Sequence, residues 1–390
     1  MKATIPSLFL LSCLVLASAT DYIVVDVDGS VEGYAALTTL LRATGGSQLK
    51  MVSVSGTTWG FSTTVVRNVC RFLNLAGKGN VEIALGASAS MDDAYNTSTK
   101  HGECFNVAGF PLTPQDAARR ELPFSRADVS SAFSAANSLP HTATTVNCGY
   151  TTDAKTSLVK ILRRVTTADK FIYLSLGSTV TNLATVVKSI QQEGDVKTLM
   201  DTLTNRSSIH VYEPGYAGAA DPTAMTTLLS YNLPIDLYPS VFFSPATQFT
   251  ESYWTRFTTI ASTVSASSSL QWVHEAWTNK KEVMGDTLFY NDCAPAASLV
   301  TLCAVDSVLT PLCKYYRATV SSVSFQLTKP SATSGVLTLD GQKVTPASYY
   351  TLVTNASPAV VRVYTKSATG EEGGRTLKDA FWSRWFELLQ

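Results

Sequence analysis

The sequence is poor in charge and in histidine. Of its 390 residues only 15% are charged, and the 30 basic residues balance the 30 acidic ones. A chain without net charge lacks the positive field that attracts nucleic acids and anionic membrane surfaces, so neither is an expected partner. The four histidines show no zinc-ligand spacing and no CxxC pair occurs, which argues against a transition-metal site.

Long apolar runs are missing after the first twenty residues. Lys2 precedes an apolar stretch over 8–16 and then Ala17-Ser18-Ala19, the pattern of a secretory signal peptide cleaved after Ala19. This apolar core is too short to span a bilayer, and no later stretch approaches the necessary length. We predict a signal peptide over residues 1–19 and a mature chain that is secreted or held in the secretory-pathway lumen. A retained N-terminal anchor is the alternative.

The mature chain keeps six cysteines, an even number that permits up to three disulfides in an oxidising compartment. Cys104 and Cys148 flank a polar stretch, and Cys303 and Cys313 bracket a turn, so each pair is a candidate bridge. Cys70 lies on an apolar helix face and could be a buried thiol. Three sequons fit a glycosylated surface, at Asn96, Asn205 and Asn355.

Apolar runs alternate with helical patterns along the chain. Strands are predicted at 22–26, 49–55 and 81–85, with helices near 31–44 and 62–76 between them. This alternation predicts an α/β fold with a mainly parallel open sheet and helices on both faces.

The same alternation resumes after a loop-rich insert at about 88–150. The later elements are a helix near 153–166, a strand at 171–176, a helix at 180–191, strands at 209–212 and 234–238, and a more antiparallel region at 319–364. Trp382, Trp385 and Phe386 have helical spacing, which predicts a face that docks on the core. We find no repeat and no linker, so residues 20–390 are predicted to form one domain.

The most informative segment follows the first predicted strand. Asp26 and Asp28 alternate with Val27, so at the strand period both carboxylates point to one side, and Glu32 follows in the first helical turn. Open α/β sheets bind ligands beyond the carboxyl ends of their strands, and clustered carboxylates suit Ca²⁺ or Mg²⁺. The same acids could instead cap the helix and solvate the turn.

Six segments in order resemble the inosine-uridine preferring nucleoside hydrolase family. The acid motif is similar to that family's D-x-D-P-G-x-D-D signature. The other segments are 51–77, Lys100-His101-Gly102, 174–184, Ala220-Asp221-Pro222 and 290–295. The resemblance implies a nucleoside hydrolase-like fold that hydrolyses the N-glycosidic bond of ribonucleosides with Ca²⁺, which orients and acidifies a water. It also implies a homo-oligomer, for which the sequence offers no interface signature.

The resemblance assigns roles position by position. It places the metal ligands at Asp26, Asp28, Leu176 (through its backbone carbonyl) and Asp292. It places the substrate-binding side chains at Glu32, Thr57, His101 and Asp292. Asp28 would also be the general base, and Asn291 stands where the family has the histidine that protonates the leaving group.

Departures from the family pattern fall on the same site. Gly33 replaces an Asp that ligates calcium through both oxygens, so calcium should bind more weakly. Asn291 cannot act as a general acid at physiological pH. Gly215-Tyr216-Ala217 replaces a polar ribose-binding loop. We therefore expect ordinary nucleosidase activity to be lost or altered, as in a pseudoenzyme.

Two other functions compete with this interpretation. The chain could be a non-catalytic secreted module that keeps the scaffold and binds a nucleoside, a sugar or another partner. The segment 24–30 also resembles the D-x-D-G-T loop of haloacid dehalogenase-type phosphatases, with Asp26 as nucleophile and Asp28 as acid/base. The middle of the chain does not match that second family.

Overall fold

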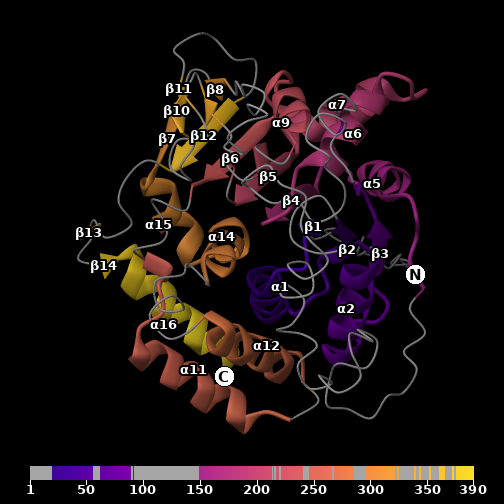
Figure 1. The fold of residues 1–390 in the computed structure, drawn as a ribbon. Coiled ribbons are helices and arrows are strands. Elements are labelled where there is room, and N and C mark those ends of the chain that lie inside the picture. The colour runs from indigo at the N-terminus through magenta and orange to yellow at the C-terminus, as the bar shows by residue number, and fades with distance from the viewer. Residues whose placement is uncertain are drawn as a thin grey trace, which may run out of the picture.

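The computed structural model describes residues 20–55, 62–88, 91, 149–212, 214, 217–218, 221–239, 246–265, 268–284, 295–320, 323–324, 338–339, 342–343, 351–352, 360–364, 371–372 and 375–390. Within them, an eight-stranded sheet in the order β3-β2-β1-β4-β5-β6-β12-β7 forms the centre of the fold (Figure 1). Seven of the strands run parallel, and β7 at the edge is antiparallel. The predicted α/β class with a mainly parallel open sheet is confirmed.

The strands of this sheet are short. Their bounds are β1 (Asp21–Val27), β2 (Leu49–Val54), β3 (Glu82–Leu85), β4 (Lys170–Leu176), β5 (Ser207–Tyr212), β6 (Pro234–Tyr238), β7 (Arg317–Val320) and β12 (Val360–Tyr364). Short strands pair two by two outside it: β8 (Val323–Ser324) with β11 (Thr351–Leu352), β9 (Thr338–Leu339) with β10 (Gln342–Lys343), and β13 (Glu371–Glu372) with β14 (Arg375–Thr376).

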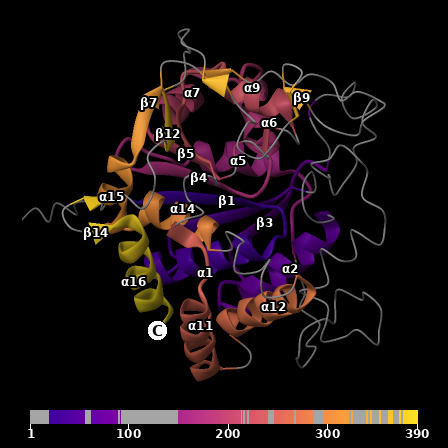
Figure 2. The same ribbon diagram turned by 60° about the vertical axis from the view of Figure 1, so that its left-hand side comes forward.

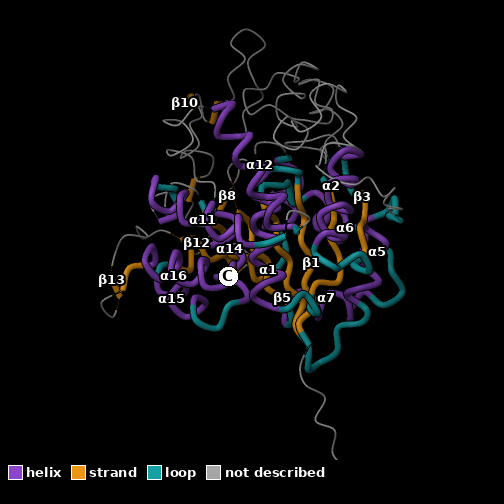
Figure 3. The backbone as a smooth tube through the Cα atoms, turned by 90° about the horizontal axis from the view of Figure 1, so that it is seen from below, coloured by secondary structure: helices purple, strands orange, loops and turns teal. Residues whose placement is uncertain are grey.

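Helices cover both faces of the sheet, as Figures 2 and 3 show. One face carries α1 (Val31–Thr44), α2 (Ser62–Leu75), α11 (Glu251–Thr263), α12 (Ser269–Met284), α14 (Ala296–Val305), α15 (Leu309–Tyr315) and α16 (Leu377–Leu389). The other carries α5 (Ala154–Leu162), α6 (Thr181–Ile190), α7 (Val196–Asn205) and α9 (Pro222–Leu229). Val25 of β1 belongs to the first core and Val24 to the second, since alternate side chains of a strand face opposite sides.

The C-terminal helix α16 docks on the core through its aromatic side chains, as its spacing predicts. Trp382 stacks on Tyr253 of α11 with ring centroids 4.2 Å apart, and Trp385 stacks on Phe257 at 5.4 Å. The Trp385 indole N–H also donates to the Thr39 hydroxyl of α1 at 2.9 Å. These contacts tie the end of the chain to its first helix.

Two parts of the fold differ from the sequence-based expectation. Helix α7 was not predicted between the segments at 180–191 and 209–212, although it packs Leu199 and Leu203 into the core. Strand β12 is antiparallel to β7, as the C-terminal pattern indicates, but it is parallel to β6, with Val361 opposite Ile235. The C-terminal region therefore completes the parallel sheet rather than forming only an antiparallel unit.

A disulfide between Cys303 and Cys313 joins α14 to α15, so this predicted bridge is confirmed. Cys70 is also disulfide-bonded, so the alternative of a buried thiol at this position does not hold. Among the described helices, none is long and apolar enough to cross a membrane alone; α14 and α15, which meet at a bend of 104°, reach that length and apolar content only when taken together. The predicted signal peptide over 1–19, Cys104, Cys148 and most of the predicted 88–150 insert lie outside the described residues.

Candidate functional site

The candidate site lies where β1 and β4 end side by side. Val27 pairs with Leu176, and the chain order along the sheet reverses here, with β2 and β3 on one side and β5 and β6 on the other. Ligands of open α/β sheets bind at this switch point because the loops on the two sides diverge and leave a crevice. The acid motif follows β1, so the fold places it at the expected edge.

Asp28 occupies the turn after β1. Its side chain is almost fully buried, and its Oδ1 accepts a hydrogen bond from the Ser30 N–H at 3.0 Å. A Cβ atom built on Gly177, which follows β4 with a φ of 85°, would lie 3.3 Å from both Asp28 oxygens. A glycine at 177 thus permits the carboxylate of Asp28 to lie close to the backbone that follows Leu176.

Leu176 and Gly33 face each other across the start of α1. Ser30 caps this helix by accepting the Gly33 N–H at 3.3 Å, so the first turn is held against the end of β4. A Cβ atom on Gly33 would lie 3.6 Å from the Leu176 carbonyl oxygen, an ordinary van der Waals separation. Asp28, the Leu176 carbonyl and Gly33 therefore lie at the same edge of the sheet, beyond the ends of β1 and β4.

Asp26 lies in β1, two residues before Asp28, and its carboxyl group contacts α6. It is fully buried; its Oδ2 accepts hydrogen bonds from the Tyr173 hydroxyl at 2.5 Å and from the Asn182 amide at 2.9 Å. Its Oδ1 accepts no hydrogen bond from the described residues. Burial raises the pKa of Asp26 to about 6, against the lowering effect of its hydrogen-bond donors. Burial also raises the pKa of Tyr173 well above its usual range.

A chain of hydroxyls continues from the site to α9. Ser55 lies 3.1 Å from Thr179, Thr181 donates to Thr179 at 2.8 Å or to Asp221 at 2.5 Å, and Asp221 is fully buried. Asp221 also accepts the Ala224 N–H as the N-cap of α9, with Pro222 in its first turn. An Asp before Pro is a typical helix start, so the pair Asp221-Pro222 could have been predicted to begin α9 from the sequence.

Glu32 has a partner that the sequence did not indicate. Its carboxylate forms an ion pair and hydrogen bond with the ammonium of Lys280 on α12, and the two side chains are only 16% and 11% exposed. The predicted ribose-binding carboxylate is thus already paired with a cation from an element 248 residues further along the chain.

The other predicted site residues cannot be placed. Thr57, His101, Asn291 and Asp292 lie outside the described residues, as does the pair Gly215-Tyr216. Within the described part of the chain, no group of three or more His, Cys, Asp or Glu side chains is arranged to hold a metal ion. Asp28 lies beside Gly177, the residue that follows Leu176, while the Leu176 carbonyl lies beside Gly33.

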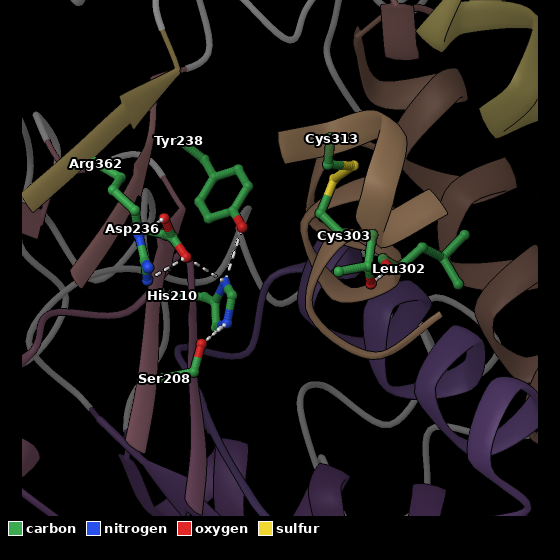
Figure 4. A network of polar contacts seen from close by, with 9 residues as sticks. Ser208, His210, Asp236, Tyr238, Leu302, Cys303, Cys313 and Arg362 are labelled. Atoms are coloured by element: carbon green, nitrogen blue, oxygen red, sulfur yellow. Dashed lines mark hydrogen bonds and ion pairs between the residues drawn. A yellow bond between two sulfur atoms is a disulfide. The ribbon is translucent and has the colours of Figure 1, made fainter. Parts of the chain in front are cut away.

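A second buried polar cluster crosses β5, β6 and β12 (Figure 4). Arg362 binds both oxygens of Asp236, at 2.7 and 3.0 Å. His210 Nδ1 lies 2.7 Å from the Tyr238 hydroxyl and 3.7 Å from Asp236, and its Nε2 lies 2.5 Å from the Ser208 hydroxyl. Although Ser, His and Asp are present, the nearest partner of Nδ1 is Tyr238 and the Asp is bound by Arg362. We assign this cluster to the cohesion of the sheet.

Comparison with solved structures gives the same fold. The chain is similar to an inosine-guanosine nucleoside hydrolase (13% identity, TM-score 0.59, 95% of this chain and 98% of that one) and to the plant nucleoside hydrolase PpNRh1 (12%, 0.55, 95% and 98%). It is also similar to the type III effector protein XopQ, solved in complex with adenosine diphosphate ribose (12%, 0.51, 96% and 93%). No family model matches the sequence, and neither does any curated protein. The fold is nucleoside hydrolase-like.

Proposed function

We propose that this chain is a secreted relative of the inosine-uridine preferring nucleoside hydrolases that binds a ribosyl ligand and has lost most or all calcium-dependent hydrolysis. The observation that carries the proposal is Gly33, which stands 3.6 Å, measured from its built Cβ, from the Leu176 carbonyl. A carboxylate there would face the same oxygen that the resemblance gives to the metal.

The described residues offer a calcium ion few ligands, and Asp292 lies outside them. Asp28 and the Leu176 carbonyl supply oxygens, while Gly33 supplies none and Glu32 is paired with Lys280. Calcium takes six to eight oxygen ligands, and its affinity rises with the number of carboxylates. Asn291 adds the second defect, because the N–H protons of an amide are too weakly acidic to be transferred to a leaving base.

Ligand binding is the activity that these losses leave in place. A ribosyl group presents several hydroxyls, which are complementary to the carboxylate of Asp28 and to the hydroxyls of Ser55 and Thr179, gathered in the buried region beyond the ends of β1 and β4. The solved XopQ complex with adenosine diphosphate ribose supports the choice of a ribosyl ligand over other classes. Ribose, inosine, uridine, adenosine and adenosine diphosphate ribose are the probes to titrate into the purified mature protein by calorimetry.

Turnover distinguishes a ribosyl-binding protein from an active hydrolase. We expect binding of at least one ribosyl probe and no release of free base above the uncatalysed rate, with or without added calcium. Tight calcium binding, together with base release that disappears in Asp28→Ala, would show that the chain is an active hydrolase.

The phosphatase alternative meets a geometric obstacle. Asp26 has no exposed surface, and Tyr173 and Asn182 hold one of its oxygens. A phosphoryl-accepting carboxylate must be reached by its substrate in line, which this burial prevents. We therefore do not propose that function, and Mg²⁺-dependent phosphatase activity that requires Asp26 would reverse this choice.

Gly33→Asp is expected to raise calcium affinity at least about tenfold, since it adds one carboxylate to the ligand set. The variant should fold, because Gly33 is helical and its Cβ would make only ordinary contacts. Isothermal titration with calcium measures the effect. Gly194→Asp is the matched control, since a Cβ on the exposed Gly194 meets no atom within 4 Å. An unchanged affinity in Gly33→Asp would disconnect this position from the metal.

A further inference from the structure

We propose that Lys280 is a specificity-determining residue of the candidate site: its ammonium supplies the positive charge there and disfavours a divalent cation. This inference rests on the proposed function for the location of the site. It goes beyond the loss of a ligand at Gly33, because it identifies a side chain whose positive charge repels a divalent cation.

The position of Lys280 follows from the packing of α12 on α1. Tyr34 of α1 contacts Trp272 of α12 edge to face, with ring centroids 4.7 Å apart. Trp272 and Lys280 are eight residues apart, which is about two helical turns, so both lie on the side of α12 that faces α1. The Lys280 side chain meets Glu32 there, one residue before Gly33 in the first turn of α1.

Burial makes this pair a fixed feature. Lys280 as a whole residue is only 9% exposed, and an ammonium is rarely buried to that degree without a partner. Removing the carboxylate of Glu32 would leave the charge of Lys280 uncompensated by that partner. The carboxylate is therefore committed to the lysine and is not available to a metal without cost.

The absence of a carboxylate at 33 and the presence of the Lys280 ammonium together change the charge of the site by as much as a bound calcium ion would. Relative to a site with an Asp at 33 and no lysine, Gly33 removes one negative charge and Lys280 adds one positive charge. The sum equals the charge of one calcium ion. A divalent cation near Leu176 would meet repulsion from Lys280 in a partly desolvated region, where charges are weakly screened.

The test measures calcium affinity in the Gly33→Asp background, with no nucleoside present. Adding Lys280→Met is expected to raise the affinity a further factor of about ten, because it removes the repulsion and releases Glu32. Adding Glu32→Gln, which keeps the lysine and removes its partner, is expected to lower the affinity. Lys281→Met is the matched control, since Lys281 lies over the Trp254 ring rather than at Glu32, and it should leave the affinity unchanged.

The two substitutions are expected to change calcium affinity in opposite directions, and the increase in Lys280→Met distinguishes the proposal from a purely structural role of Lys280. If Lys280 only held α12 against α1, both substitutions would lower stability and neither would raise calcium affinity. An unchanged or weaker affinity in the Lys280→Met variant would overturn the proposal, and so would a stronger one in Glu32→Gln. Should Lys280→Met not fold, Lys280→Gln, which also removes the ammonium but keeps a polar end beside Glu32, carries the same expectation of a raised calcium affinity. Failure of every ribosyl probe to bind would refute the proposed function alone.

Discussion

Replacing Arg362 by methionine is expected to lower the free energy of unfolding by about 3–5 kcal/mol. Arg362 of β12 holds both oxygens of Asp236 on the neighbouring β6, and the Asp236 side chain is 1% exposed. Without the guanidinium, this buried carboxylate loses its bidentate partner and retains His210 at 3.7 Å as a cationic neighbour only when the imidazole is protonated. Urea denaturation followed by far-ultraviolet circular dichroism measures the loss.

Two further variants test whether the loss of stability depends on the burial of the ion pair. Arg163→Met breaks an exposed pair with Glu193 and Asp195, and we expect it to leave the urea midpoint almost unchanged. Adding Asp236→Leu to Arg362→Met removes the stranded charge and should recover part of the lost stability. If the surface and buried variants had equal effects, the cohesive role of the Asp236 cluster would be refuted.

Asp26→Asn is expected to flatten the dependence of stability on pH between about 4 and 6. The pKa of Asp26 is raised from 3.8 to about 6, so in this interval the folded state binds more protons than the unfolded state. Stability of the wild-type protein therefore falls as the pH rises through the interval, by about 3 kcal/mol for this one group. Asn resembles the protonated carboxyl and does not pay this cost. Thermal unfolding of both proteins at several pH values measures the difference.

Asp153→Asn supplies a control of opposite sign. Hydrogen bonds from Thr156 lower the pKa of this mostly exposed carboxylate, so its contribution is present above its ordinary pKa and is lost as the pH falls through the folded value. An Asp26→Asn profile parallel to that of the wild type would contradict a raised pKa at Asp26.

Local patterns in the sequence suffice to predict many of the strands and helices in the first half of the fold. The strand at 22–26 and the helix at 31–44 are predicted within one or two residues, because apolar alternation and the Ser30 cap act over a few neighbours. Helix α7 is missed although Val196, Leu199 and Leu203 have helical spacing, since four apolar residues in ten, counting Met200, give a weak pattern.

The contacts that decide the site are less accessible to such reasoning. The turn at Asp28 and its place beside the end of β4 at Leu176 could be predicted, because parallel strands end at a common edge and the resemblance names both residues. The pairing of Glu32 with Lys280 could not, since nothing near either residue signals the other across 248 positions. The same holds for Asp26, whose environment is set by Tyr173 and Asn182 from β4 and α6.

The insertion of β12 between β6 and β7 constrains the order in which a nascent chain can assemble. Strand β7 precedes β12 in sequence yet joins the sheet only through it, and the parallel edge of β6 has no partner until residue 360 has been synthesised. For more than a hundred residues of translation, a growing chain would present that open edge, the kind of surface that pairs with other chains. Ribosome-bound chains arrested before residue 360 should therefore depend more on chaperones than chains arrested after α16 has emerged.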